Sequence, residues 1–183
     1  VWEYGLYEKI RSRIKPGMVF LDVGANIGLF SVYAQSLGAK VIAVEAMESN
    51  SDFVSASECY NSFLGEAAVA ARNAASASHG KMPRRRLPGE INLYNYAVHP
   101  SPDGVDCTIE GLTGNRDDGH LLCEENDGDA SATKPEGTAR LARLDSIVLD
   151  ALGGARGGDD DVRVDFMKID VEGFEQAAME SAS

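Results

Sequence analysis

The residues whose types and spacing suggest chemistry lie in the segment 22–28, which reads Asp-Val-Gly-Ala-Asn-Ile-Gly. It follows an apolar run over residues 18–23 and leads into a mostly apolar or small segment over 27–37. Glycines at a strand-to-helix turn let the backbone approach a ligand closely, because a Cβ atom would collide with it. Ligands of open α/β sheets bind at the carboxyl ends of the strands, so this turn is a candidate ligand site.

An acid at the end of the next apolar run, residues 40–45, fits the same site. Glu45 follows Gly24 by 21 residues. A carboxylate at that place can accept both hydrogen bonds of a ribose diol. The turn and Glu45 together therefore predict a site for a cofactor that carries a ribose. The simpler alternative is that the glycines only serve a tight turn between a strand and a helix.

The turn departs from the dinucleotide-binding pattern G-x-G-x-x-G. Aligned on Gly24, the sequence has Asn26 and Leu29 where the second and third glycines should stand. Asp22 at the strand end would repel a pyrophosphate, whereas it would suit a ligand with an ammonium group. S-adenosylmethionine carries an ammonium, a sulfonium and a ribose, and no phosphate. The pattern therefore favours a methyl donor, with a nicotinamide-dependent oxidoreductase as the alternative.

A second group of acids follows the apolar run over residues 162–169. Asp170 comes directly after this run and Glu172 two residues later. In a parallel sheet Asp170 would face the same crevice as Gly24, near the transferred methyl group, where it would orient the acceptor or accept its proton. The alternative is that Asp170 or Glu172 caps the helix that follows. Lys168 is expected to be a satisfied structural charge.

The order of the apolar runs predicts an α/β fold. A strand, a helix and a strand within residues 18–45 form a βαβ unit, which requires parallel strands. Further strands are expected over 91–98 and 162–169, and further helices over 52–64, over 141–152 and from 173 onward. We therefore expect a mostly parallel, Rossmann-like sheet. Its fourth strand would have an open edge, so the sequence predicts a chain truncated after that strand.

The length of 183 residues fits a single domain, expected to span 1–183 and to be incomplete at its C-terminus. Two segments are predicted insertions. Residues 65–90 are rich in alanine and contain three consecutive arginines. Residues 111–138 are rich in glycine and acids without a clear period, so they are expected to form a mobile surface loop.

Composition limits the possible partners. The 29 acids outnumber the 17 lysines and arginines, which gives a formal net charge of -12 and argues against nucleic acid. No apolar run approaches the roughly 18 to 20 residues of a membrane span, and no signal peptide is visible, so a cytoplasmic location is expected. The three cysteines and three histidines show no metal-binding spacing, and reduced cysteines are expected. The sequence does not indicate the oligomeric state.

Four segments of the sequence resemble the FkbM-type methyltransferases. They are VFLDVGANIGLF at 19–30, VIAVE at 41–45, LD at 144–145 and FMKIDVEGFE at 166–175. This resemblance implies a class I, Rossmann-like methyltransferase fold that binds S-adenosylmethionine. It also implies O-methylation of a small molecule or of a sugar hydroxyl, which would be the acceptor.

The resemblance further implies roles for individual residues. The turn residues expected at the amino-acid end of the donor are Asp22, Gly24, Ala25, Asn26 and Gly28. Glu45 would hold the ribose, and Tyr96 and Ala97 would lie near the adenine. The pair at 144–145 would have a structural role. If the chain is truncated, a third possibility is a non-catalytic fragment of a methyltransferase.

Overall fold

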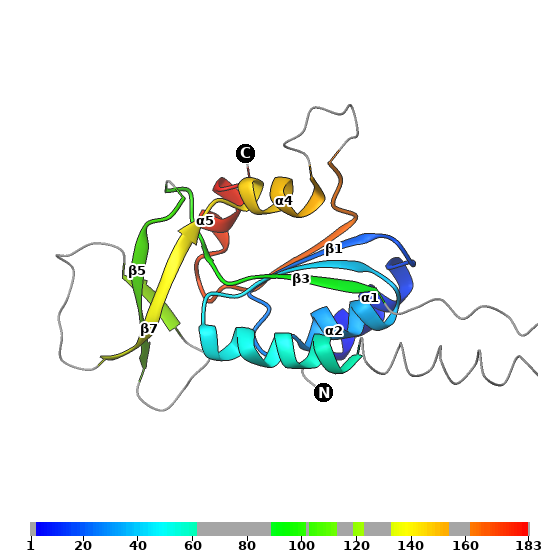
Figure 1. Ribbon diagram of the computed structural model, residues 1–183, viewed down its shortest axis with the longest axis horizontal. Coiled ribbons are helices and arrows are strands. Elements are labelled where there is room, and N and C mark those ends of the chain that lie inside the picture. The colour runs from blue at the N-terminus through cyan, green and yellow to red at the C-terminus, as the bar shows by residue number, and fades with distance from the viewer. Residues whose placement is uncertain are drawn as a thin grey trace, which may run out of the picture.

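The structure is a computed structural model that describes residues 3–61, 89–101, 103–112, 119–122, 133–153 and 162–182. A four-stranded sheet lies between two layers of helices, and a second four-stranded sheet lies beyond one end of it (Figure 1). That residues 1–183 form one domain stays a prediction.

The first sheet is entirely parallel and has the strand order β3-β2-β1-β8. Its strands are β1 (Val19–Val23), β2 (Lys40–Val44), β3 (Glu90–Tyr94) and β8 (Phe166–Ile169). Every residue of β1 is buried because helices cover both faces of the sheet. The α/β fold with a four-stranded parallel sheet, predicted from the apolar runs, is confirmed.

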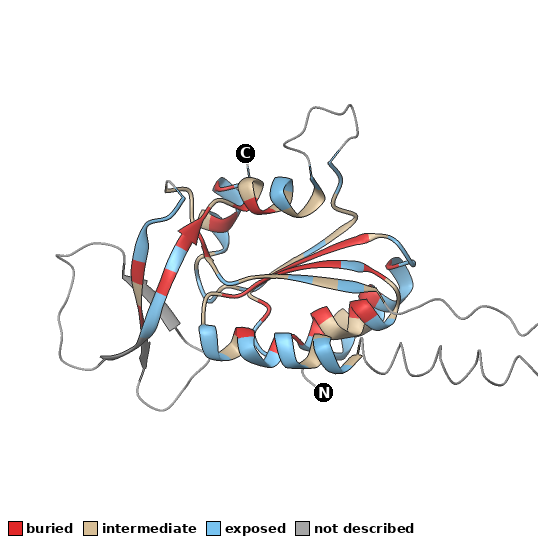
Figure 2. Ribbon diagram, in the orientation of Figure 1, coloured by how far each residue is buried: buried red, intermediate tan, exposed pale blue. Residues whose placement is uncertain are grey.

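Helices cover the two faces of this sheet (Figure 1). On one face lie α1 (Tyr4–Arg13), α2 (Leu29–Ser36) and the helical residues 48–61, and on the other lie α4 (Leu144–Leu152) and α5 (Glu175–Glu180). Side chains alternate between the faces along a strand. Phe20 therefore packs with the first group, and Leu21 with the second. Figure 2 shows that buried residues concentrate along the central strands and on the helix sides facing them.

The second sheet has the strand order β4-β7-β5-β6. Its strands are β4 (Ala97–Val98), β5 (Asp106–Leu112), β6 (Gly119–Leu122) and β7 (Thr133–Ala142). Only the β4–β7 pair is parallel among its described pairs. The strand predicted over 91–98 is thus divided between the two sheets. The division falls at Asn95, whose side-chain amide donates to the backbone carbonyl of Glu45 at 2.8 Å.

Several elements differ from the sequence-based expectation. Within the predicted loop over 111–138, residues 111–112, 119–122 and 133–138 belong to strands. These strands form by pairing with other segments of the chain, and no local pattern in the sequence encodes that pairing. Residues 65–88 of the other predicted insertion lie outside the described residues, and β3 begins at residue 90. Cys107 is disulfide-bonded, so the expectation of reduced cysteines is wrong at this position.

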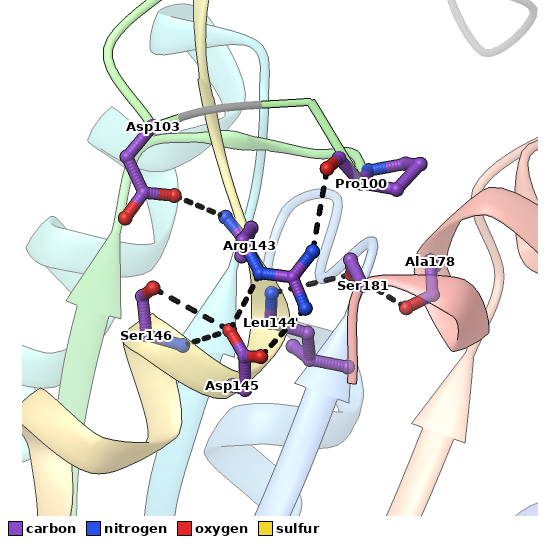
Figure 3. Close-up of polar contacts among 8 residues, drawn as sticks. All are labelled: Pro100, Asp103, Arg143, Leu144, Asp145, Ser146, Ala178 and Ser181. Atoms are coloured by element: carbon purple, nitrogen blue, oxygen red, sulfur yellow. Dashed lines mark hydrogen bonds and ion pairs between the residues drawn. The ribbon is translucent and has the colours of Figure 1, made fainter. Parts of the chain in front are cut away.

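The connection between β7 and α4 forms a network of polar contacts around Asp145 (Figure 3). Arg143 donates to both carboxylate oxygens of Asp145, from Nε at 3.2 Å and from Nη2 at 2.7 Å. Its Nη1 also donates to the carbonyl of Pro100. The backbone N–H groups of Leu144 and Asp145 donate to the Oγ and carbonyl oxygen of Ser181. These contacts connect α4 with the end of α5 and with the segment after β4.

Candidate active site

A cavity of about 430 Å³ lies at the carboxyl ends of β1, β2 and β8. This is the edge of a parallel sheet at which ligands bind. Part of the opposite wall comes from the second sheet, through Val98 of β4 and Ile109 of β5. The predicted site residues that line the cavity are Gly24, Asn26, Glu45, Tyr96, Ala97, Asp170 and Glu172. The structure therefore brings together predicted site residues from four separate segments of the sequence.

Three predicted site residues are not among the described residues that line the cavity: Asp22, Ala25 and Gly28. Asp22 is fully buried and Ala25 is 5% exposed within the core. Gly28 has a φ of +83°, and a Cβ atom there would lie 2.9 Å from Cγ2 of Val54 in the helical segment 48–61. These three residues therefore support the turn without lining the cavity.

Gly24 lies where the turn after β1 meets the end of β8. Its φ is +76°, and a Cβ atom there would overlap the carbonyl oxygen of Asp170. The N–H groups of Gly24 and Ala25 donate to the carbonyl of Val44 at 2.9 and 3.0 Å. The N–H of Asp170 donates to the carbonyl of Val23 at 3.0 Å. Glycine is therefore required here by close packing between three strand ends, whatever the ligand.

Glu45 connects the turn after β1 with the loop after β2. Its side chain is nearly buried, and Oε2 accepts a hydrogen bond from the N–H of Asn26 at 2.8 Å. Oε1 accepts from the N–H of Met47 at 3.0 Å and from Nδ2 of Asn50 at 3.3 Å. A carboxylate offers about four acceptor positions, so these three bonds leave capacity for a ligand. Its predicted contact with a ribose stays a prediction.

Sequence reasoning missed Asn95, which directly follows β3. Its side-chain amide donates to the carbonyls of Glu45 and Ala46 at 2.8 and 3.1 Å and to Oγ of Ser51 at 3.0 Å. These bonds hold the loop after β2 at the cavity edge. The sequence signal was a polar residue that interrupts the apolar run over 91–98, at the carboxyl end of the predicted strand.

Strand pairing brings Lys168 beside Asp22. The two residues lie opposite each other in the β1–β8 register, and Nζ of Lys168 lies 3.3 Å from Oδ1 of Asp22. Ser31 of α2 donates to the other carboxylate oxygen at 2.7 Å. Burial raises the pKa of Asp22, an effect that Lys168 and Ser31 oppose. The cation beside Asp22 in this structure is thus Lys168, whereas the sequence suggested the ammonium group of a ligand.

The acids after β8 have separate surroundings. The side chain of Asp170 is 54% exposed, and its Oδ2 lies 3.6 Å from Nζ of Lys168. Glu172 is exposed, with a φ of +48°. No side-chain hydrogen bond caps α5, and it is Glu175 that accepts from the N–H of Gly173 at 3.2 Å. The carboxylate of Glu175 accepts hydrogen bonds from its own backbone N–H and from that of Gly173. These bonds lower the pKa of Glu175, and the bond to its own N–H has the larger effect.

The charged side chains on the cavity wall are mostly acidic. Among the described residues that line it, four are acids and one is basic: Glu3, Glu45, Asp170, Glu172 and Lys168. A concave site with walls of one sign of charge concentrates the opposite sign. This cavity therefore attracts cations and repels anions.

A parallel sheet flanked by helices, with a cavity at the carboxyl ends of its strands, is consistent with a Rossmann-like methyltransferase fold. The chain matches the Methyltransferase FkbM domain over residues 22–183 and belongs to that family. The comparison with curated proteins gives no match. Family membership confirms the resemblance seen in the sequence and supports a methyltransferase. Within the described residues, no helix has the length and apolar character needed to cross a membrane.

Proposed function

We propose that this protein binds S-adenosylmethionine in the cavity and transfers its methyl group to a hydroxyl oxygen of a small molecule or sugar. The observation that carries the proposal is the charge of the cavity wall, with four carboxylates and one lysine among its described residues. That lysine, Lys168, is itself paired with two carboxylates. Such a wall attracts an ammonium and a sulfonium and repels the pyrophosphate of a nicotinamide dinucleotide.

The residues of the cavity suit the parts of this methyl donor. The volume of about 430 Å³ falls within the range of small-molecule sites. Glu45 has acceptor capacity for a ribose diol, and the turn at Gly24 and Asn26 presents backbone groups to the amino-acid end. Tyr96 and Ala97 offer an aromatic ring and a small side chain for the adenine. Asp22, Ala25 and Gly28 would support donor binding indirectly, by shaping the turn.

S-adenosylmethionine supplies a methyl group on a positively charged sulfur, and this charge disappears during transfer. Strong electrostatic binding of the sulfonium therefore contributes little to the rate. The residues of this chain would act chiefly by holding the acceptor in line and by excluding water. A hydroxyl group is a poor nucleophile until a base takes its proton. Asp170, half-exposed at the cavity, would orient the acceptor hydroxyl and accept this proton, with Glu172 beside it.

The proposal is tested by equilibrium binding of labelled S-adenosylmethionine to the purified chain. We expect saturable binding, and Glu45→Gln should weaken it by about 10- to 100-fold, because a charged acceptor of hydrogen bonds is lost. The matched control is Glu48→Gln, which removes the same charge from an exposed residue that does not line the cavity. This control should bind as the wild type does.

The other outcomes separate the alternatives. Absence of saturable binding to a chain that circular dichroism shows to be folded would refute the proposal. Protection from thermal unfolding by NAD, without protection by S-adenosylhomocysteine, would favour the nicotinamide-dependent oxidoreductase. A folded chain that binds neither ligand would favour the third possibility, a non-catalytic fragment.

A further inference from the structure

We infer that Lys168 is a positioning residue, which fixes the turn at Gly24 and the carboxylate of Asp170 relative to each other. Where it concerns donor binding, this inference rests on the proposed function. It goes beyond the structural charge expected from the sequence, because it assigns to Lys168 an effect on the geometry of the cavity wall.

The contacts of Lys168 join three elements of the site. Its Nζ donates to the carbonyl of Gly24 at 2.8 Å and lies 3.3 Å from Oδ1 of Asp22 and 3.6 Å from Oδ2 of Asp170. The ammonium also lies 5.6 Å from the ring centroid of Phe30, at the start of α2. The ammonium donates a hydrogen bond to the carbonyl of Gly24, and the carboxylates of Asp22 and Asp170 are its ion-pair partners.

Burial makes this arrangement specific. The side chain of Lys168 is 8% exposed and that of Asp22 is fully buried, whereas the side chain of Asp170 is 54% exposed. Buried ionised groups are held by their partners, so the ammonium has few alternative positions. The one positive charge neutralises the buried carboxylate of Asp22. The remaining negative charge of the trio lies on Asp170, at the cavity.

Loss of the charge of Lys168 and loss of its contacts should change the affinity for a cationic ligand in opposite directions. Removal of a positive charge from the wall should strengthen the binding of a cation if long-range attraction alone matters. Loss of the contacts to Gly24 and Asp170 should weaken binding, because the turn would no longer be held in place. The sign of the change in affinity therefore separates the two effects.

The test compares the wild type with Asp22→Asn, Lys168→Met/Asp22→Asn and Lys168→Arg. The double variant removes the buried acid together with its counter-ion, which avoids an unpaired buried charge and keeps the fold testable. Lys40→Met serves as the matched control, because Lys40 is an exposed lysine on β2 outside the cavity. Urea unfolding of each variant separates global stability from changes at the site.

The first readout needs no ligand. Hydrogen exchange of the turn amides over 24–28 should be roughly tenfold faster in the double variant than in Asp22→Asn. Lys40→Met should leave this exchange unchanged, and Lys168→Arg should restore part of the protection. Equal exchange in the double variant and Asp22→Asn would overturn the inference, whether or not the protein binds a methyl donor.

The second readout is the affinity for S-adenosylmethionine and for S-adenosylhomocysteine, which lacks the sulfonium charge. Both should bind roughly tenfold more weakly to the double variant than to Asp22→Asn, since both would contact the same turn. Unchanged or tighter binding would refute the positioning role in donor binding. If the wild type binds neither compound, the proposed function fails, and hydrogen exchange alone decides the role of Lys168.

Discussion

Asp170 has the accessibility that a proton acceptor in this site would need. Its carboxylate is half-exposed at the cavity, so an acceptor can reach it, and Lys168 lies 3.6 Å away. Asp22 has the same functional group but is fully buried and bonded to Ser31 and Lys168. The surroundings of the two carboxylates therefore support the proposed proton acceptor at Asp170 and a structural role for Asp22.

We predict that Asp170→Asn lowers kcat for methyl transfer by about 100-fold, because asparagine cannot take a proton from the acceptor. The Kd for S-adenosylmethionine should change by less than about threefold. The measurement uses methyl-labelled donor with a panel of sugars and small alcohols. Asp52→Asn, at an exposed position outside the cavity, is the control. An unchanged kcat in Asp170→Asn would show that this carboxylate takes no part in the reaction.

At the residue scale, the sequence predicted well which residues line the cavity. It predicted less well which partners each of these residues contacts. Gly24, Glu45 and Asp170 were predicted from their places at the ends of apolar runs, and all three line the cavity. The partner of Asp22 was not predicted, because Lys168 lies 146 positions along the chain. Its place depends on the register between β1 and β8, which no local pattern encodes.

Among the elements, the turn after β1 is tightly constrained. It reverses direction within a few residues, hydrogen-bonds to β2 and packs against the end of β8. Gly24 combines a positive φ with a backbone carbonyl in the place that a Cβ atom would occupy. A side chain at this position therefore forces the ends of β1 and β8 apart.

We predict that Gly24→Ala lowers the free energy of unfolding by more than about 3 kcal/mol, because backbone cannot move aside as a flexible side chain can. Gly17→Ala is the matched control, since Gly17 has a similar φ of +87° and no atom within 4 Å of the added Cβ. The control should cost about 1 kcal/mol, the strain of the left-handed backbone alone. Equal losses in urea unfolding would show that the close approach of β8 is not constraining.

The elements also show where sequence patterns are sufficient to predict secondary structure. The unit from β1 through α2 to β2 was predicted because each apolar run has the length and flanking glycines of its element. Strands β5, β6 and β7 were not, because their pairing joins separate segments of the chain, as between Asp106 and Arg140, which no local pattern encodes. Pro135 within β7 pairs with Glu110 next to a register shift, an irregularity that also weakens a strand signal.

At the scale of the whole molecule, the cavity belongs to both sheets. The parallel sheet supplies the turns with the acidic residues, and the second sheet supplies apolar residues, including Ile109 of β5. Tyr96 lies between β3 and β4, where the chain passes from one sheet to the other. A ligand that fills the cavity would therefore contact segments from both sheets and connect them.

This arrangement predicts the pattern of amide protection on donor binding. At a concentration of 100 times Kd, S-adenosylmethionine stabilises the folded protein by about 2.7 kcal/mol. Amides that exchange only after the ligand has left should therefore exchange about 100-fold more slowly. Segments 24–28, 45–47, 96–98 and 170–173 and the β5 amides near Ile109 should all exchange more slowly, whereas α4 should change little. The measurement is hydrogen exchange with mass spectrometry. Slower exchange confined to 24–28, 45–47 and 170–173 would mean that the donor contacts the parallel sheet alone, and that the second sheet contributes nothing to binding.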